Sequence, residues 1–455
     1  MKPLNGPRSS SLVQLFNWIF RPLEYQEECR QKYGDSFNLN LIGIPPFTIV
    51  SEPQNVQEVL AVDAQKFDVG RTNGLAASLL GDNSLVLLDG VEHRRQRKLM
   101  MPPFHGEKVK SYAQTISNLA EAEANRWQTR QSFIAQKAMQ NITLETILHV
   151  VFGLSEGDRY QQIKPLLIEL LDVTGSPLRA SMIFLPLLQR DWGEWSPWGK
   201  VVRRKRKIYE LLQAEIEDRR ANPELQKDDV LSLMMSAKDE AGEGLSDIEL
   251  KDQMMTLLVA GHDTTATALS WAFYWVHKLP KVKQKLLAEL DSFDDADPLA
   301  ISRLPYLTAV CNETLRIYPV AIVAFARIAR TPVEVMGRQL EPESMVVPSL
   351  YLTHHREDLY PEPKKFKPER FLERDYSPYE FYPFGGGNRR CIGYALALLE
   401  MKIILAKIVT QWDLDLASDR PVLPKRRGAT LAPHNGVPLI LKGKRSVKAS
   451  ASAIN

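Results

Sequence analysis

The segment FGGGNRRCIG, residues 384–393, carries the strongest local signal in the chain. Its three consecutive glycines permit backbone conformations that are closed to other residues. Cys391 lies where an apolar, helix-periodic segment, residues 394–409, begins. A helix N-terminus offers free N–H groups and a partial positive charge, and Arg389 and Arg390 add two cations. We expect this environment to favour a thiolate over a thiol at Cys391.

A thiolate in this position has more than one interpretation. It can be a nucleophile, a metal ligand or a buried structural cysteine beside a turn. A nucleophile needs a general base, and none of the eight histidines is tied to this segment by its place in the sequence. The segment alone leaves the three interpretations open.

The composition excludes several classes of protein. The chain has 455 residues, of which 44% are hydrophobic and 25% are charged, as in an ordinary globular protein. The net charge of 58 − 55 = +3 is too small to indicate nucleic-acid binding through bulk charge. The three cysteines, Cys29, Cys311 and Cys391, contain no CxxC pair, which excludes a disulfide framework and a cysteine-rich zinc site.

The sequence contains no run of about 18 apolar residues, so we expect no transmembrane anchor. The N-terminal segment does not resemble a signal peptide, because Gln14 and Asn17 interrupt its apolar run. We therefore expect a cytoplasmic protein. Residues 12–20 predict either a segment packed on the body of the protein, which we favour, or a loose membrane contact. The side chains that could form the apolar face are Leu15, Phe16, Trp18, Ile19 and Phe20.

Hydrophobic periodicity predicts a mainly α-helical fold with small β-sheets. Helices are predicted at residues 105–127, 134–152, 201–220, 246–279, 299–318 and 395–412. Strands are predicted at residues 37–41, 47–50, 333–335, 345–347 and 437–441, and the first two form a hairpin. No linker separates two self-sufficient halves, so we predict one large domain, residues 1–441, and a basic, flexible tail, residues 442–455.

The spacing Phe384-x-x-Gly387-x-Arg389-x-Cys391-x-Gly393 resembles the haem-binding signature of the cytochrome P450 monooxygenases. The resemblance implies one P450-like domain that encloses haem b, iron protoporphyrin IX. It implies further that Cys391 is the axial iron ligand, that Phe384 packs near the sulfur, and that Arg389 contacts a haem propionate. Thiolate ligation pushes electron density onto iron and favours O–O cleavage, which suits a monooxygenase.

Glu313-Thr-Leu-Arg316 places a carboxylate and a guanidinium group on one helix face, where they can form an ion pair. Such pairs are common, and the alternative is a surface salt bridge worth under about 1 kcal/mol. The segment Pro368-Glu-Arg370-Phe371 follows, as it does in the P450 family. The resemblance implies a buried structural triad of Glu313, Arg316 and Arg370 that holds the cysteine segment.

Ala260-Gly-His-Asp-Thr-Thr265 resembles the oxygen-activation motif of the same family. A glycine inside a helix costs up to about 1 kcal/mol relative to alanine, so we expect Gly261 where dioxygen and haem approach the backbone closely. Thr264 can donate to the carbonyl four residues earlier and deform the helix. The resemblance implies that Asp263 and Thr264 are the catalytic residues, an acid and a hydroxyl that deliver protons. The alternative, a solvated helix face, is disfavoured by the apolar flanks.

His93-Arg-Arg-Gln-Arg97 resembles the helix that grips the haem propionates in this family. The spacing of four residues puts His93 and Arg97 on one helix face. Arg327 lies where the family often has another propionate partner, and His355 is a weaker candidate for the same role.

The resemblance implies monooxygenation, in which one atom of O2 enters a C–H bond and the other becomes water. The chain has no GxGxxG motif after a strand and no cysteine cluster. Electrons are therefore expected from a ferredoxin or flavodoxin with an NAD(P)H reductase. A basic surface could dock this acidic partner. Its predicted members are Arg94, Arg95, Lys98, Lys108 and Lys110.

The substrate is predicted to be hydrophobic, because the segments that line the pocket in this family are largely apolar here. These segments are residues 67–86, 166–188, 256–260, 320–325 and 429–431. The whole chain resembles bacterial, especially cyanobacterial, hydroxylases of long-chain fatty acids or alkanes, and some relatives act on terpenes. We favour a fatty acid over a terpene. Arg71 or Arg179 could anchor a carboxylate, and residues 182–188 could form a mobile lid.

Two other functions stay open at this point. One is a haem-thiolate isomerase or peroxygenase, which would not use Asp263 and Thr264 to activate O2. The other is a non-catalytic haem-binding sensor or lipid-binding module. The intact Gly261-x-Asp263-Thr264 sequence argues against the first alternative.

Overall fold

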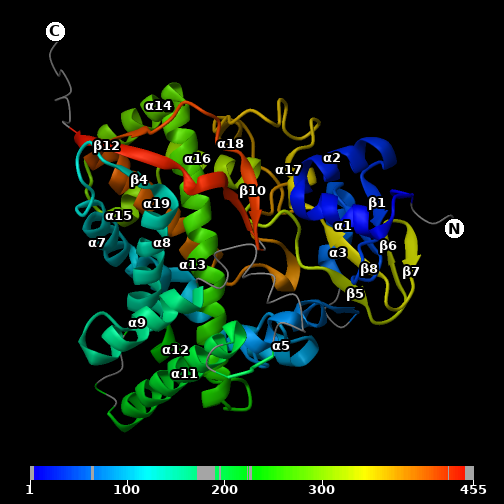
Figure 1. Cartoon of the computed structure of the whole chain (residues 1–455), viewed down its shortest axis with the longest axis horizontal. Coiled ribbons are helices and arrows are strands. Elements are labelled where there is room, and N and C mark those ends of the chain that lie inside the picture. Colours follow the sequence, from blue (N-terminus) through cyan, green and yellow to red (C-terminus); the bar gives the residue numbers. More distant parts are fainter. Residues whose placement is uncertain are drawn as a thin grey trace.

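Figure 1 shows the chain as a computed structural model. The structure describes residues 5–62, 66–171, 190–193, 196–222, 224, 228–428 and 430–445, without the side chain of residue 75. The predicted lid, residues 182–188, and most of the predicted tail lie outside the described residues.

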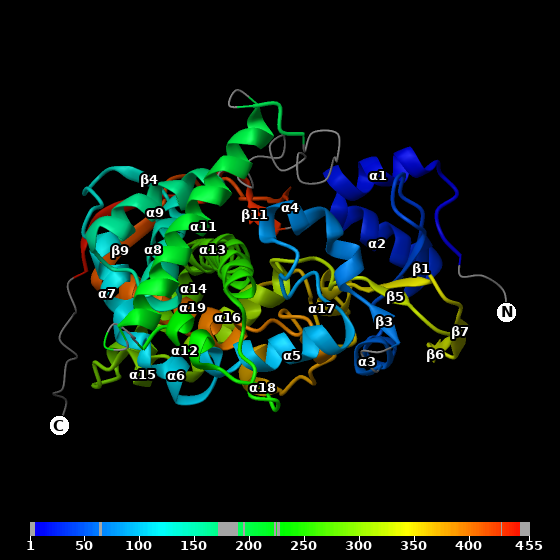
Figure 2. The same cartoon turned by 90° about the horizontal axis from the view of Figure 1, so that it is seen from below.

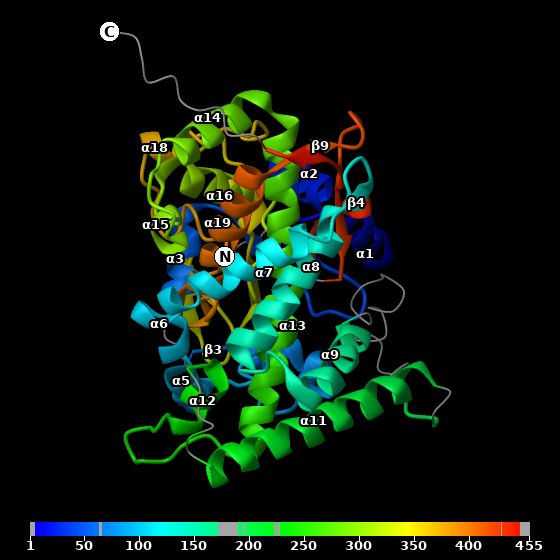
Figure 3. The ribbon, with the colours of Figure 1, turned by 90° about the vertical axis from the view of Figure 1, so that its left-hand side faces the viewer.

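The central helix α13 (Asp247–Lys278) runs through the larger, helical part of the molecule (Figures 1 and 3). It begins at a capping box, because Ser246 Oγ accepts the N–H of Glu249 at 3.4 Å while Glu249 Oε2 accepts the N–H of Ser246 at 2.7 Å. It ends before Pro280, which lacks an N–H and starts the next helix. The predicted helix over residues 246–279 is therefore confirmed.

The other helices surround α13 or cover the sheets. They are α1 (Ser11–Phe20), α2 (Pro22–Tyr33), α3 (Pro53–Ala61), α4 (Ala77–Leu80), α5 (Gly90–Met100), α6 (Gly106–Ser111), α7 (Ala113–Ala124), α8 (Ala135–Thr146), α9 (Gly157–Leu171), α11 (Pro197–Ala221), α12 (Val230–Ser236), α14 (Pro280–Asp291), α15 (Pro298–Ile301), α16 (Pro305–Ile317), α17 (Leu350–His354), α18 (Arg370–Glu373) and α19 (Tyr394–Gln411). Helices α8, α16 and α19 pack directly on α13. Because α13 is apolar around most of its circumference, these contacts bury it on several sides.

A five-stranded sheet forms the opposite part of the molecule (Figure 2), in the order β1-β2-β8-β5-β3. Its strands are β1 (Ser36–Leu39), β2 (Phe47–Val50), β3 (Phe67–Asp68), β5 (Arg327–Ala329) and β8 (Met345–Pro348). The antiparallel pair β1–β2 confirms the predicted hairpin, and β8 joins β2 in parallel. The sheet thus brings the N-terminal region beside a segment some three hundred residues later.

Three smaller sheets complete the fold. They are β4 (Ser132–Ile134), β12 (Pro438–Lys444) and β9 (Trp412–Leu416) in that order, the ribbon β10 (Pro424–Arg427) with β11 (Thr430–Pro433), and β6 (Val333–Val335) with β7 (Arg338–Leu340). Strand β12 extends to Lys444, which pairs with Trp412. The first residues of the predicted tail therefore belong to a sheet.

Two of the long predicted helices are each divided into two helices in the structure. The helix predicted over residues 105–127 divides into α6 and α7, because the chain tightens at Tyr112, whose N–H donates to Val109 O at 3.3 Å. The helix predicted over residues 299–318 divides at Pro305, which starts α16 without an N–H to continue an earlier helix. The helix predicted over residues 134–152 ends in a wider turn, since the N–H of Phe152 donates to Ile147 O.

Helix α1 differs from the favoured prediction for residues 12–20. Trp18 packs on the body, but Phe16, Ile19 and Phe20 are exposed. The prediction that this apolar segment packs on the protein is therefore wrong for most of its side chains. Among the described residues, none of the helices combines the length and the apolarity needed to cross a bilayer.

Candidate functional site

An internal cavity of about 360 Å³ lies between α13, α5, the start of α19, the cysteine segment and residues 320–325. Most of its lining is apolar, as predicted for a pocket that holds a hydrophobic ligand. The predicted site residues that line it are His93, Arg97, Gly261, Thr264, Arg327, Phe384, Arg389 and Cys391. Residues far apart in the sequence therefore meet here.

The glycines of the cysteine segment are required by its shape. Gly385 and Gly387 have φ values of +67° and +64°, which L-residues with side chains rarely adopt. A Cβ at residue 387 would also collide with the backbone carbonyl of Leu60. The loop closes with a hydrogen bond of 2.9 Å from the N–H of Cys391 to Phe384 O. This closure fixes the cysteine beside the start of α19.

Cys391 has accessible surface, and that surface faces the cavity. Burial raises the pKa of its thiol, while the N–H of Gly393 and the charges of Arg97 and Arg390 lower it. The helix start and the cations therefore favour the thiolate, as expected, while burial opposes it.

The cavity edge is rich in buried cations. Burial, together with the neighbouring Arg389, lowers the pKa of Arg327 to about 10, and burial lowers that of Arg389 to about 10 as well. Arg97 has no hydrogen-bond or ion-pair partner among the described residues, and burial also lowers its pKa. Burial lowers the pKa of His93 to about 3, so its imidazole is neutral at pH 7. The positive charge of these arginines is therefore only partly neutralised by acidic side chains.

Asp89 is a site residue that the sequence did not single out. Its Oδ1 accepts from Arg389 at 2.5 Å and from the N–H groups of Val69 and Gly70 at 2.8 and 2.9 Å. Arg389 also donates to Leu88 O at 2.6 Å. These bonds tie the cysteine segment to the loop before α5. An aspartate just before a helical segment is a recognised signal for the start of a helix, so the sequence could have indicated Asp89.

On α13, the residues that line the cavity include Gly261, Thr264, Thr265 and Ala268, which follow helical spacing. Thr264 Oγ1 donates to Ala260 O at 2.6 Å, which confirms the predicted bond to the carbonyl four residues earlier. A Cβ at residue 261 would meet only Ile147 Cδ1, at 3.5 Å. The protein leaves free space beside Gly261, and this space is available to a ligand in the cavity.

Asp263 is not among the lining residues. Its Oδ1 accepts from Gln140 Nε2 at 2.8 Å, and the guanidinium of Arg427 lies 3.9 Å away. On an α-helix Asp263 is turned by about 100° from Thr264. The structure therefore places the predicted acid beside the cavity wall, held on its outer side by α8 and β10.

The predicted triad is formed. Glu313 and Arg316 are fully buried and joined by two hydrogen bonds of 2.7 and 2.8 Å, and Arg370 Nε donates to Glu313 Oε1 at 3.1 Å. The N–H of Lys367 gives the carboxylate a further donor at 2.8 Å. A buried carboxylate with this many donors is not a surface salt bridge.

His354 connects the triad to the cysteine segment, and no motif in the sequence indicated this role. Its backbone carbonyl accepts from Arg316 at 2.8 Å, and its Nε2 accepts the N–H of Tyr382 at 3.1 Å. Tyr382 lies two residues before Phe384. The neighbouring His355 donates through Nδ1 to Tyr351 O and is not in the cavity lining, so the structure does not place it where a propionate partner would be.

The predicted basic surface is largely neutralised. Four of its five members form ion pairs: Arg95 with Asp239, Lys98 with Glu240, Lys108 with Asp228 and Lys110 with Glu107. Among the residues that the structure describes, only Arg94 of this set has no ion-pair partner. Most of these positive charges are therefore paired, and docking of an acidic partner on this surface stays a prediction.

The predicted substrate segments are borne out in part. Leu85, Val86, residues 256–257, Ala260 and most of residues 320–325 line the cavity. Leu431 does not, and Ala429 and Arg179 lie outside the described residues. Arg71 pairs with Glu343 on the surface and does not line the cavity, so it is not placed to anchor a substrate carboxylate.

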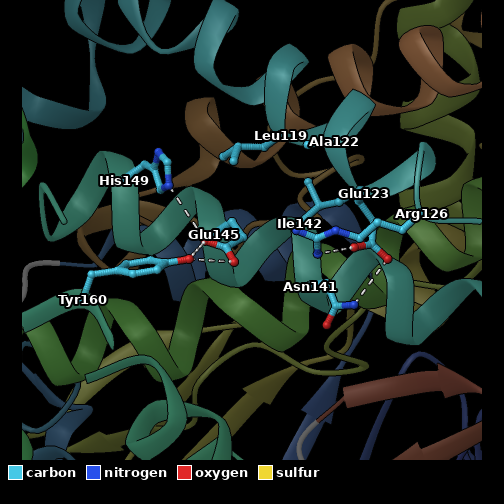
Figure 4. Close-up of a pocket in the computed structure, with 9 residues that line it drawn as sticks. All are labelled: Leu119, Ala122, Glu123, Arg126, Asn141, Ile142, Glu145, His149 and Tyr160. Atoms are coloured by element: carbon cyan, nitrogen blue, oxygen red, sulfur yellow. Dashed lines mark hydrogen bonds and ion pairs between the residues drawn. The ribbon is translucent and has the colours of Figure 1, made fainter. Parts of the chain in front are cut away.

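A second cavity, of about 170 Å³, lies among α7, α8 and α9 (Figure 4). Its two carboxylates already have donors. Glu145 accepts from Tyr160 OH at 2.9 Å and from Lys164, and Glu123 accepts from Asn141 and Arg126 at 3.3 Å. No cluster of three metal-ligating side chains occurs within the described part of the chain. This cavity therefore offers no free ligand group.

Three comparisons with known proteins agree with this geometry. The family model described as Cytochrome P450 matches residues 4–439. A Mycobacterium tuberculosis protein provisionally named cytochrome P450 135B1 is 36% identical over 449 residues, covering 98% of this chain and 93% of its own. Another from the same organism, provisionally named cytochrome P450 135A1, is 31% identical and covers 97% and 95%.

Two solved structures share the fold. Retinoic acid-bound cyanobacterial CYP120A1 superposes with a TM-score of 0.81 at 24% identity, over 95% of this chain and 96% of its own. The haem domain of cytochrome P450DA gives 0.83 at 23% identity, over 98% of both chains. The chain belongs to the cytochrome P450 family, whose members are haem-thiolate monooxygenases that use O2 and redox partners.

The residues around the large cavity fit protoporphyrin IX haem. Its interior is apolar, a cysteine sulfur faces it, and its edge carries cations with unused donors. His93 Nδ1 and Arg389 Nε are buried without a hydrogen-bond partner. A flat, apolar group with two carboxylates would supply acceptors for these donors and anionic charge for these cations.

Glu400 is a further lining residue that the sequence did not indicate. It lies on α19, is buried, and has no hydrogen bond or ion pair among the described residues. Burial raises its pKa from 4.5 to about 8. Between these two values the native protein binds the proton more tightly than the unfolded chain, so stability falls as the pH rises through this window.

We predict that Glu400→Gln removes this pH dependence. The variant and the wild type unfold alike near pH 5, and the variant is more stable by about 2–4 kcal/mol near pH 8, because the wild type must bury a charge there. Urea unfolding at both pH values measures the difference. The exposed Glu334→Gln serves as the control. Equal stability of variant and wild type at pH 8 contradicts the prediction.

We predict that Arg316→Leu lowers the free energy of unfolding by about 3–5 kcal/mol, because it leaves the Glu313 carboxylate buried with fewer donors. The control is Arg21→Leu, which removes a half-exposed ion pair with Glu28 and should cost under about 1 kcal/mol. Thermal and urea unfolding compare the two variants. Similar losses in both would show that the triad is not a stabilising centre.

Proposed function

We propose that Cys391 ligates the haem iron through its thiolate and that this chain inserts one oxygen atom from O2 into a hydrophobic substrate held above the haem. The observation that carries the proposal is the single cavity that joins Cys391, Thr264 and the cationic edge. The overall balance is RH + O2 + 2 e⁻ + 2 H⁺ → ROH + H2O. When bound, haem supplies the iron chemistry that cleaves O2 and transfers one of its atoms.

In this proposal the residues around the cofactor hold it and set its charge. The N–H of Gly393 and the charges of Arg97 and Arg390 stabilise a negative sulfur at position 391. His93, Arg97, Arg327 and Arg389 bind the two carboxylates. The chain of bonds through Glu313, Arg316 and His354 keeps the cysteine segment in one conformation and so fixes the sulfur in the cavity.

Two residues of α13 move protons in this proposal. Thr264 Oγ1 faces the cavity and can hold a proton donor there. Asp263 can receive protons from the outer side, where Gln140 and Arg427 hold its carboxylate. To reach Thr264, the Asp263 side chain must leave Gln140. This arrangement separates proton uptake from proton delivery.

We propose a long-chain fatty acid as the substrate. The apolar lining supports a long alkyl chain, and the related fold of CYP120A1 accommodates retinoic acid, a long apolar carboxylic acid. A terpene is the second candidate. The ion pair between Arg71 and Glu343 supports a terpene, because Arg71 is then not free to bind a substrate carboxylate. The electron donor that we propose is a separate ferredoxin or flavodoxin with its NAD(P)H reductase.

The substrate candidates are separated by titrating the ferric protein with palmitic acid, its methyl ester and a sesquiterpene while following the iron spin state. A recognised carboxylate makes the acid bind at least about tenfold more tightly than the ester, which corresponds to one charge-assisted hydrogen bond. Equal affinity for acid and ester, together with a response to the sesquiterpene, favours the terpene.

We predict that Cys391→Ala abolishes the strongly red-shifted Soret band of the reduced, CO-bound protein, because that band reports thiolate ligation. Cys311→Ala, which removes a buried cysteine far from the cavity lining, keeps the band. Absorption spectra of purified holoproteins provide the measurement. A band that persists in Cys391→Ala contradicts the assignment of the ligand.

We predict that Thr264→Ala uncouples the reaction, so that product formed per NAD(P)H falls about tenfold or more while peroxide is released. Thr265→Ala, which changes the next threonine in the same cavity wall, keeps most of the coupling. Product, NAD(P)H and peroxide are measured in one assay. Turnover without NAD(P)H would favour an isomerase or peroxygenase, and haem binding without turnover by any donor would favour a sensor.

A further inference from the structure

Most of the apolar side chains of helix α1 lie outside, whereas the polar side chain of Gln14 lies inside. Leu12, Phe16 and Phe20 are 62%, 58% and 67% exposed, whereas Gln14 is 2% exposed. Helices that cover a globular core show the reverse pattern, with the apolar stripe facing inward. We call the five exposed side chains the α1 face. They are Leu12, Val13, Phe16, Ile19 and Phe20.

The inner side of α1 is fixed by specific contacts. Gln14 Nε2 donates to Pro7 O and Ser9 O at 3.1 and 2.9 Å, and its Oε1 accepts the N–H of Asn40 at 2.9 Å. Trp18 packs edge-on against Phe47, with ring centroids 5.9 Å apart. Because these contacts satisfy buried polar groups, rotating the helix to bury its apolar side would break them. The α1 face is therefore held outward.

Helix α1 lies at the outer boundary of the molecule (Figure 2). The rings of Phe16 and Phe20 contact each other on it, with centroids 4.7 Å apart. Apolar exposure also occurs in neighbouring segments, at Ile42 and Ile44 in the turn after β1, to which Gln14 is bonded. Contiguous exposed apolar side chains of this kind mark an interaction site.

The charge beside the α1 face is positive. Arg8, just before the helix, and Lys425, on the strand β10 that packs against α1, are exposed and have no ion-pair partner among the described residues. Arg21, at the end of α1, is paired with Glu28 at 2.6 Å and adds no net charge. An apolar face with free cations at its border complements a surface that is apolar inside and anionic outside.

We propose that the α1 face docks on the surface of an anionic lipid bilayer, with its phenylalanine rings inserted at the level of the headgroups and Arg8 and Lys425 on lipid phosphates. The bilayer fits better than a second copy of the chain. A helix of 10 residues is about 15 Å long and 10 Å wide, and its single face offers far less than the roughly 800 Å² per partner of a stable dimer. This inference goes beyond the proposed function and does not depend on the substrate.

The test is sedimentation of the full-length holoprotein with vesicles of phosphatidylcholine alone or with 30% phosphatidylglycerol. We expect the wild type to bind the mixed vesicles and to bind pure phosphatidylcholine several-fold less. Phe16→Ser/Phe20→Ser should lower binding to mixed vesicles at least about tenfold. The matched control, Leu372→Ser/Ile248→Ser, removes two half-exposed apolar side chains elsewhere and should bind like the wild type.

A third variant tests the cations. Arg8→Gln/Lys425→Gln should bind mixed vesicles no better than phosphatidylcholine vesicles. The proposal is overturned if the wild type does not bind mixed vesicles, or if the phenylalanine variant binds like the wild type. It is also overturned if the preference for anionic lipid survives in the cation variant. Self-association that depends on Phe16 and Phe20, without vesicle binding, would identify a second copy as the occupant instead. The haem absorption spectrum of each variant verifies that it is folded.

Discussion

The structure depends on one buried carboxylate. Glu313 is fully removed from water and is held by the guanidinium groups of Arg316 and Arg370 and by a backbone N–H. Such a group is tolerated only when its charge and lone pairs are satisfied together. Through Arg316, His354 and Tyr382 this centre reaches the loop that carries Cys391. Helix α16, the irregular segment around residue 365 and the cysteine loop are therefore positioned by a single polar network.

The cavity combines an apolar environment with a cationic one, and these two would not coexist without a ligand of matching chemistry. Its interior is apolar, yet its edge gathers His93, Arg97, Arg327 and Arg389, with Asp89 as the acidic partner of Arg389. Burial lowers the pKa of each of the three arginines, so these charges are poorly solvated there. In the proposed complex, the carboxylates of haem would offset this loss of solvation and its macrocycle would occupy the apolar space. Fold, electrostatics and cofactor thus support the same account.

The sequence predicted the lining residues of the site through short motifs that resemble those of the cytochrome P450 family. Gly387 and Cys391 belong to the glycine-rich motif, and Thr264 belongs to the motif in the central helix. Their local features, a turn before a helix start and a bond across four residues of one helix, agree with that interpretation. His354, Gln140 and Glu400 lie in no such motif, and the partners of His354 and Gln140 are distant in the chain. Asp89 carries only the general signal of a helix start. The charge of the basic surface depends on distant partners as well: Lys98 pairs with Glu240, 142 residues later. For α1, the sequence indicated an apolar segment, but the pattern of its residues does not say which side faces the protein.

The central claim is that the sulfur of Cys391 binds the haem iron. X-ray absorption at the iron edge of the purified holoprotein tests it directly, because sulfur and light-atom ligands scatter differently. The account predicts one sulfur in the iron coordination shell of the wild type and none in Cys391→Ser. An iron with only nitrogen and oxygen ligands in the wild-type protein would contradict it.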